Sequence, residues 1–269
     1  MLERLKDYVQ GLTKRISPNE PEKKRVIITV HGYGRRRKHE LDNLAAWGKK
    51  DGFEVIQFDL FDMDDEQDCD WMKWVNRAKE VVDRYVLNDY QVDMVGFSMG
   101  GVIASYLAAT CPIHRLVLIA PAFSYVNVEN ITNIITKSAT SFLGNDKKEK
   151  KYKELPKTFF AAFGDTVKSL KKYIAFVECP ILILHGDEDE VISLKSSIQA
   201  FEKIKHNKKR LLIFHGGHHR LLMDTSVNWE VYQNIKLFLN GDIIPNYEII
   251  NAPDIMDQLE IHPEEIKKA

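Results

Sequence analysis

The sequence has few cysteines and no long apolar run, and each absence excludes a class of protein. Its three cysteines, Cys69, Cys111 and Cys179, are an odd number at long spacings, so neither a disulfide framework nor a Cys-x-x-Cys metal or redox site is expected. No stretch approaches the roughly 18 apolar residues of a membrane span. Residues 1–20 carry frequent charges and lack the apolar region of a signal peptide. We therefore expect a cytoplasmic protein without stable membrane insertion.

The chain also lacks an excess of charge of either sign. Its 38 Lys and Arg residues balance 39 Asp and Glu, giving a net charge of −1, so nothing in the overall charge would draw it to nucleic acid. A length of 269 residues with 44% hydrophobic content is enough for one sizeable core. These values favour a single domain over residues 1–269 that acts on a small molecule.

Six short apolar runs are spread along the chain, at residues 26–30, 55–58, 92–95, 116–120, 181–184 and 211–214. Runs of this length, rich in β-branched residues and without polar alternation, are typical of strands buried on both faces. Segments with helical periodicity lie between some of these runs, at residues 71–86 and 101–109, and after the last one, at residues 229–239. The alternation predicts an α/β fold with a doubly wound, mostly parallel sheet.

Three segments depart from this alternation. Residues 2–16 have the apolar spacing of an amphipathic surface helix. Residues from about 123 to 165 are predicted to form a helical cap inserted over the sheet. Four of its apolar residues are candidates to line a pocket or to pack on the sheet: Ile131, Ile134, Ile135 and Phe142. The tail at 242–269 contains three prolines and no clear period.

The most informative segment is the turn Gly96-Phe-Ser98-Met-Gly100, which follows a predicted strand and precedes a predicted helix. A serine at so sharp a turn sits in strained backbone, and glycines are needed on either side because a side chain would collide there. The turn would expose the hydroxyl of Ser98 above the sheet, as a nucleophile requires.

This layout resembles the nucleophile elbow of the α/β-hydrolase family, and other segments between about residues 25 and 239 are similar to it. Val30-His-Gly-Tyr-Gly34 looks like the family's His-Gly oxyanion loop. The resemblance implies that the backbone N–H groups of Tyr33 and Met99 form the oxyanion hole. We assign His31 no chemical step.

The acid of the family's triad corresponds to Asp189, in the segment His185-Gly-Asp-Glu-Asp189 after a predicted strand. Asp187 and Glu188 lie on the same loop and are alternatives. The base follows the last predicted strand, where His218 and His219 are adjacent. The resemblance favours His219, because an Arg and an apolar residue follow it, and His218 stays open.

The order Ser98, Asp189, His219 is the chain order of the family. A serine nucleophile implies acyl transfer, and the resemblance is closest to small-cap carboxylesterases and monoacylglycerol-lipase-like enzymes. We expect hydrolysis of a carboxylic ester or thioester of a small or lipid-like substrate through an acyl-serine intermediate, with no cofactor and no metal. The alternatives are an acyltransferase with the same triad and a non-catalytic ligand-binding protein on this fold.

Two charge runs remain, a basic one at 35–38 and an acidic one of Asp62, Asp64, Asp65, Glu66, Asp68 and Asp70. Both follow predicted parallel strands and so belong at one edge of the sheet, which favours mutual compensation. The other hypothesis is that Arg35 to Lys38 receive an acidic group of the substrate. The acidic run lacks the glycine and the spacing of an EF-hand, so it is not expected to bind a metal.

Overall fold

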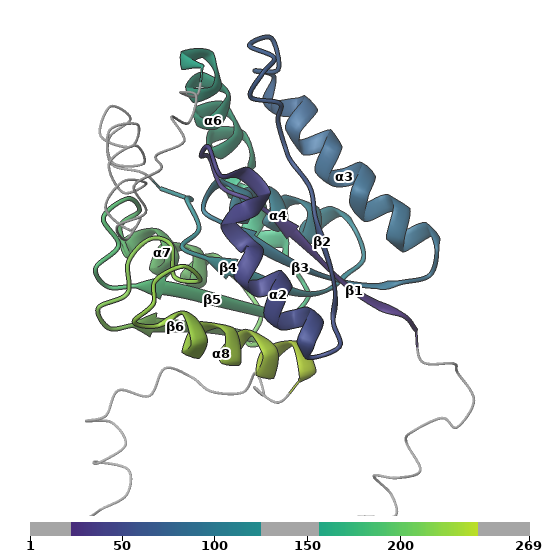
Figure 1. Cartoon of the computed structure of the whole chain (residues 1–269), viewed down its shortest axis with the longest axis vertical. Helices are drawn as coiled ribbons and strands as arrows, with labels where there is room; N and C mark the ends of the chain where they lie inside the picture. Colours follow the sequence, from purple (N-terminus) through teal and green to yellow (C-terminus); the bar gives the residue numbers. More distant parts are fainter. Residues whose placement is uncertain (1–22, 125–155, 242–269) are drawn as a thin grey trace, which may run out of the picture.

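The computed structural model describes residues 23–124 and 156–241, which form one sheet with helices on both faces (Figure 1). The sheet order is β2-β1-β3-β4-β5-β6, and every neighbouring pair is parallel. The strands are β1 (Arg25–Val30), β2 (Glu54–Gln57), β3 (Gln91–Phe97), β4 (Ile113–Ile119), β5 (Ile181–Gly186) and β6 (Lys209–Phe214). The predicted α/β fold with a parallel sheet is confirmed, and each predicted apolar run overlaps a strand.

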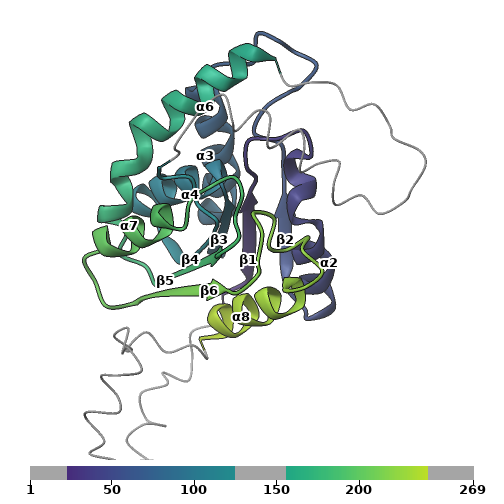
Figure 2. The ribbon, with the colours of Figure 1, turned by 90° about the vertical axis from the view of Figure 1, so that its left-hand side faces the viewer.

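The helices divide into two layers, one on each face of the sheet (Figure 2). The first face is covered by α3 (Trp71–Leu87), α4 (Met99–Thr110), α6 (Lys157–Leu170), the 3-10 helix η2 (Lys171–Phe176) and α7 (Lys195–Lys203). The second is covered by η1 (Arg37–Leu41), α2 (Asp42–Lys50) and α8 (Asn228–Asn240). Each layer encloses its own hydrophobic core.

The strands have continuous apolar runs because both of their faces are buried. Successive side chains of a strand point to opposite faces, so Val26, Ile28 and Val30 enter the core under α3 and α4, whereas Ile27 enters the core under α2 and α8. The same parallel order brings the carboxyl ends of all six strands to one edge. The loops that carry the predicted site residues follow β1, β3, β5 and β6, and therefore meet at that edge.

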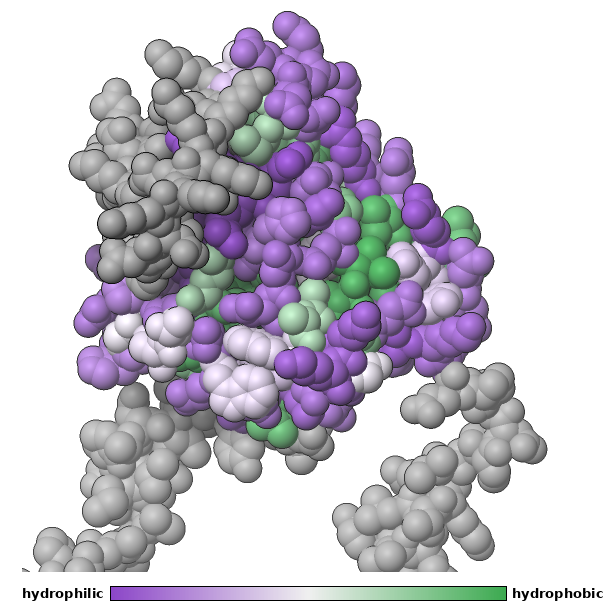
Figure 3. All heavy atoms as spheres, viewed as in Figure 1, coloured by the Kyte–Doolittle hydropathy of each residue, from purple (hydrophilic) through white to green (hydrophobic). Residues whose placement is uncertain are grey.

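β2 forms one edge of the sheet in the described part of the chain. Its Val55 and Ile56 are only partly buried, and Figure 3 shows a hydrophobic area near this edge on an otherwise largely hydrophilic face. The antiparallel strands that open many α/β-hydrolases have no counterpart in residues 23–124 or 156–241.

Several predicted segments lie outside the described residues: the N-terminal helix at 2–16, most of the cap insertion, including Ile131, Ile134, Ile135 and Phe142, and the tail at 242–269. Of the cap range 123–165, residues 157–165 form the first part of α6, which packs on α3 and α4. Among the helices that the structure describes, none is long and apolar enough to cross a membrane.

Candidate active site

Ser98 stands alone between the end of β3 and the start of α4, with a φ of 52°. Non-glycine residues rarely adopt such a backbone, and it persists only where the surroundings enforce it. A Cβ on Gly96 would lie 2.6 Å from the Cα of Gly101, and one on Gly100 would lie 2.1 Å from the carbonyl oxygen of Val30. Both glycines are therefore required for the turn to pack against β1 and α4.

The backbone around Ser98 is held by hydrogen bonds to β4 and the loop after it. Its N–H donates to the carbonyl oxygen of Ile119 at 2.9 Å, and its own carbonyl oxygen accepts from the N–H groups of Gly101 and Ala122 at 3.0 and 3.1 Å. Only 7% of Ser98 is exposed. The backbone of Ser98 is thus fixed at the carboxyl edge of the sheet, and the residue is buried, whereas the turn predicts an exposed hydroxyl.

The loop after β1 lies directly against Ser98. A Cβ on Gly32 would lie 2.9 Å from the Cβ of Ser98, so glycine is needed for this close approach. Tyr33 follows Gly32, and Met99 follows Ser98. Within residues 23–124 and 156–241, no acceptor is paired with the N–H of Tyr33 or of Met99. Two unpaired donors beside a serine hydroxyl can stabilise an oxyanion without rearrangement.

His31 fixes this loop from within the core. Its Nδ1–H donates to the carbonyl oxygen of Gly32 at 2.7 Å, and its Nε2 accepts from the N–H of Leu60 at 2.9 Å. Burial lowers the pKa of His31 to about 4, so the ring is neutral at pH 7. Both ring nitrogens are occupied, which suits a positioning role for His31.

Asp189 and His219 form a buried pair. Nδ1 of His219 lies 2.9 Å from one carboxylate oxygen of Asp189, and the other oxygen accepts from the N–H groups of Val191 and Ile192, each at 2.8 Å. Burial by itself would raise the pKa of Asp189, but the histidine rings of His219 and His185 outweigh it and hold that pKa well below its ordinary value. Asp189 is therefore ionised and keeps Nδ1 of His219 protonated.

The loops after β5 and β6 are packed backbone to backbone. A Cβ on Gly186 would lie 1.9 Å from the carbonyl oxygen of Gly217, which itself accepts from the N–H of Glu188 at 3.1 Å. Asp187 turns away to His215, at 2.8 Å, and the side chain of Glu188 is 62% exposed. Of the three candidate acids on this loop, the structure brings Asp189 to His219.

His218 faces a different carboxylate from His219. Nδ1 of His218 lies 2.9 Å from Asp224, which raises the pKa of His218 through that hydrogen bond. The ring of His219 instead lies 4.9 Å from the ring of Phe97, the residue before Ser98. The ring of His219 therefore contacts both Asp189 and Phe97, the residue before Ser98.

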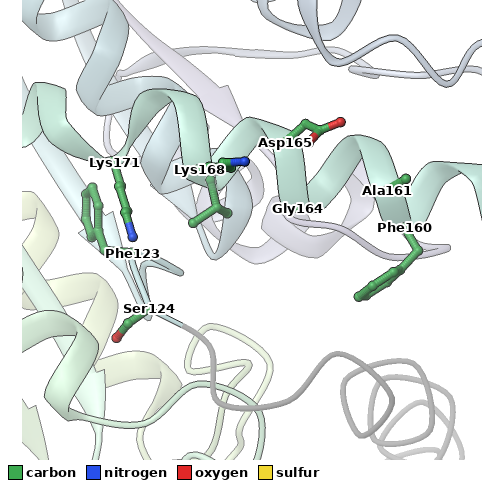
Figure 4. Close-up of a pocket in the computed structure, with 9 residues that line it drawn as sticks. Phe123, Ser124, Phe160, Ala161, Gly164, Asp165, Lys168 and Lys171 are labelled. Carbon is green, nitrogen blue, oxygen red and sulfur yellow. The ribbon is translucent and has the colours of Figure 1, made fainter.

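A cavity of about 560 Å³ opens beside α6 (Figure 4). Phe160 lines it and also contacts the ring of Tyr33, with 6.2 Å between centroids, so the cavity begins next to the loop that touches Ser98. Its walls are partly apolar and partly charged, formed by Phe123, Ser124, Phe160, Ala161, Gly164, Asp165, Val167, Lys168 and Lys171. No cluster of metal-ligating side chains occurs in the described part of the chain.

Three residues of the charge runs, Arg37, Lys38 and Asp68, pair differently from the predicted mutual compensation. Arg37 and Lys38 contact Asp59, which precedes the acidic run, at 3.4 and 3.5 Å. Asp68 pairs with Arg77 of α3 at 2.6 Å. The prediction was wrong for these residues because the acidic loop folds back on α3, a packing that charge patterning does not reveal.

Sequence reasoning missed Glu40 altogether. Its carboxylate is buried and contacts Nε of Arg220 at 3.0 Å, joining η1 to the residue after His219. The backbone N–H of His219 also donates to Glu190 at 3.2 Å. Neither contact has a local sequence signal, because the partners lie far apart in the chain.

Many solved structures are similar in fold to this chain. A monoacylglycerol lipase from Paleococcus ferrophilus is 15% identical with a TM-score of 0.62, over 81% of this chain and 96% of that one. Est1E from Butyrivibrio proteoclasticus is 21% identical with a TM-score of 0.59, over 84% and 91%. A soluble variant of monoglyceride lipase from Saccharomyces cerevisiae is 18% identical with a TM-score of 0.64, over 84% and 89%.

The chain therefore has the α/β-hydrolase fold, and the resemblance seen in the sequence is confirmed at that level. Residues 145–226 match the family model Hydrolase_4, described as serine aminopeptidase, S33. The matched range contains Asp189 and His219 but not Ser98. No curated protein matches the chain.

Proposed function

We propose that the protein is a serine hydrolase that cleaves a carboxylic ester or thioester through an acyl-Ser98 intermediate. The observation that carries the proposal is the His219 ring, which bonds Asp189 through Nδ1 and packs on Phe97 beside the strained Ser98 turn. This arrangement leaves Nε2 of His219 as the nitrogen that accepts the serine proton.

In the proposed reaction the hydroxyl oxygen of Ser98 attacks the ester carbon while Nε2 of His219 takes the proton. The tetrahedral intermediate collapses as His219 returns that proton to the leaving alcohol, so the C–O bond breaks and an acyl-serine remains. Water then attacks the acyl-serine, giving up a proton to His219, and the carboxylic acid leaves as Ser98 regains its proton. No cofactor or metal takes part.

The electrostatics around the three residues support these steps. Asp189 stays ionised because its pKa is held low, so it can stabilise the imidazolium that forms on His219. The N–H groups of Tyr33 and Met99 are the proposed donors to the oxyanion. Losing one such donor typically slows turnover by roughly 100- to 1000-fold.

The substrate class follows from the serine and from the cavity. The partly apolar cavity beside α6 suits a small or lipid-like ester, and the structures of similar fold include a monoacylglycerol lipase and a monoglyceride lipase. We propose that Phe123 and Phe160 contact the apolar part of the substrate.

A panel of p-nitrophenyl esters from acetate to palmitate tests the proposed function. The wild type should hydrolyse at least one chain length, and Ser98→Ala should lower kcat by on the order of 10⁴-fold or more. Ser169→Ala, on a partly exposed position of α6, is the control and should leave the rate unchanged. Absence of turnover with every ester, or equal rates for wild type and Ser98→Ala, would contradict the proposal.

An acyltransferase would use the same three residues. Adding glycerol or a long-chain alcohol to the assay separates the two reactions, because a hydrolase releases mainly free acid, whereas a transferase releases mainly the new ester. We expect free acid to be the main product, and a new ester as the main product would favour the transferase.

A further inference from the structure

The basic turn, residues 35–38, lies on the rim of the proposed site. It begins two residues after Tyr33, the proposed oxyanion donor, and leads into η1. At the other end of η1, Glu40 contacts Arg220, the neighbour of His219, at 3.0 Å. Asn43 at the start of α2 also donates to the carbonyl oxygen of Leu222 at 2.7 Å. The segment from the basic turn through η1 to Asn43 therefore joins the loop at Ser98 to the loop of His219.

The positive charge of this turn is only partly compensated. Asp59 is the carboxylate that contacts both Arg37 and Lys38, at 3.4 and 3.5 Å. The side chain of Arg36 forms no ion pair or hydrogen bond with any other residue, in the part of the chain that the structure describes. Nε of Arg36 and Nε of Arg37 are both buried without an acceptor. A buried donor without a partner is destabilising. The terminal guanidinium nitrogens of Arg36 are not among the buried unpaired atoms, so these are the nitrogens that an anion can reach.

The turn has a defined conformation. Arg37 has a φ of 49°, which is unfavourable for a residue with a side chain. The N–H of Lys38 donates to Asp59 at 3.2 Å, and Gln57 donates to the carbonyl oxygen of Lys38 at 2.9 Å. Arg37 also donates to the carbonyl oxygen of Gly34 at 3.3 Å. These three bonds, two of them to Gln57 of β2 and Asp59 after it and one within the turn itself, hold the strained turn in place.

We propose that Arg36, assisted by Arg37, binds an anionic group of the ester, so that the preferred substrates carry a carboxylate besides the ester bond. A guanidinium presents its N–H donors in a fork that matches two oxygens of one carboxylate. Arg220 cannot serve in this way, because Glu40 already neutralises it. This inference rests on the proposed hydrolase function and specifies its substrate class.

Two matched pairs of esters test the proposal, each consisting of an anionic ester and a neutral one. Mono-4-nitrophenyl adipate and 4-nitrophenyl hexanoate place the carboxylate on the acyl side. 4-(Butyryloxy)benzoate and its methyl ester place it on the leaving group. Arg36→Gln removes the charge, and Arg36→Lys retains it without the fork. Arg84→Gln makes the same change at an exposed position near the end of α3, which leads into the end of β3 opposite to Ser98.

We expect Arg36→Gln to raise KM for the anionic member of one pair by about tenfold, with kcat and the neutral member unchanged. Arg36→Lys should restore part of the loss, and Arg84→Gln should have no effect. Raising the ionic strength should weaken the preference of the wild type for the anionic ester, because the turn is partly exposed. Equal effects on the anionic and neutral esters, or no effect on either, would overturn the proposal.

Calorimetric titration with adipate and with 4-hydroxybenzoate separates this inference from the proposed function. If no ester is hydrolysed, the function fails, but carboxylate binding by wild type and Arg36→Gln can still be compared. Weaker binding to Arg36→Gln would then support the anion subsite, and equal or absent binding in both proteins would overturn it.

Discussion

His218 and His219 are neighbours in the chain, but their rings have different acidic partners. His219 pairs with Asp189, whose side chain is 1% exposed, and His218 pairs with Asp224. The proposed mechanism needs the carboxylate of Asp189 to hold the tautomer of His219 and to stabilise its charged form. The pair Asp224 and His218 has no step in it.

Asp189→Asn is therefore predicted to lower kcat by on the order of 10⁴-fold with little change in KM, because an amide favours the wrong tautomer of His219. Asp224→Asn makes the same chemical change at the partner of His218 and should leave kcat within a few-fold of the wild type. Steady-state kinetics on the best ester of the panel measures both. A larger loss in Asp224→Asn than in Asp189→Asn would assign the base to His218 instead.

Local sequence patterns identify some residues of this site but not others. The Gly-x-Ser-x-Gly spacing identifies the Ser98 turn because the two glycines are a local requirement of the backbone. The choice among Asp187, Glu188 and Asp189, and between His218 and His219, depends on loops from β5 and β6 that meet only in the fold. The contact between Glu40 and Arg220 spans 180 residues and leaves no local pattern.

At the scale of the elements, the strands and long helices could be predicted, but α2 and α7 could not. A buried parallel strand is apolar on both faces, so its run stands out in the sequence. α2 and α7 each have only nine residues, with few buried positions, and so short a segment is not identified as a helix from periodicity alone. Their few buried apolar side chains, such as Leu44 and Ala200, pack into the two cores that cover the sheet.

A buried charge network ties several elements together at the amino end of β3, away from Ser98. Asp93 is fully buried and contacts Arg25 of β1 and His114 of β4. Arg25 and Arg115 also donate to the carbonyl oxygen of Leu239 near the end of α8. A cation at a helix C-terminus is favourable, so the network fastens α8 to the sheet.

Asp93→Asn should lower the free energy of unfolding by about 3 kcal/mol, because it leaves Arg25 half-buried without its partner. The activity of the folded protein well below its Tm should be unchanged, since the network is at the opposite end of the strand from Ser98. Lys79→Gln is the control, because it breaks an exposed ion pair with Asp83 and should leave the free energy of unfolding unchanged. Urea unfolding gives the comparison, and equal stabilities for Asp93→Asn and wild type would contradict this account of the network.

At the scale of the whole molecule, folding stability should depend on pH through His31. The pKa of His31 is about 4 in the folded protein against 6.5 for an ordinary histidine. Between these values the unfolded chain binds more protons than the folded one, so stability falls as the pH falls from about 6.5 to 4. The lowered pKa of Asp189 acts in the same direction but only below its ordinary value of 3.8.

We expect His31 to make the wild type less stable at pH 4.5 than at pH 7 by about 2 kcal/mol. His31→Gln removes this contribution whatever its own effect on stability, so its curve should be flatter over the same range. Urea unfolding at a series of pH values measures both proteins. Parallel curves for wild type and His31→Gln would show that His31 is not buried as a neutral ring.

The most direct test of the central claim is to treat the protein with a fluorophosphonate and locate the adduct by peptide mass spectrometry. We predict one phosphonyl group per chain, on Ser98, formed slowly by His219→Ala and absent from Ser98→Ala. No adduct on the folded wild type, or an adduct that persists in Ser98→Ala, would contradict the assignment of Ser98 as the nucleophile.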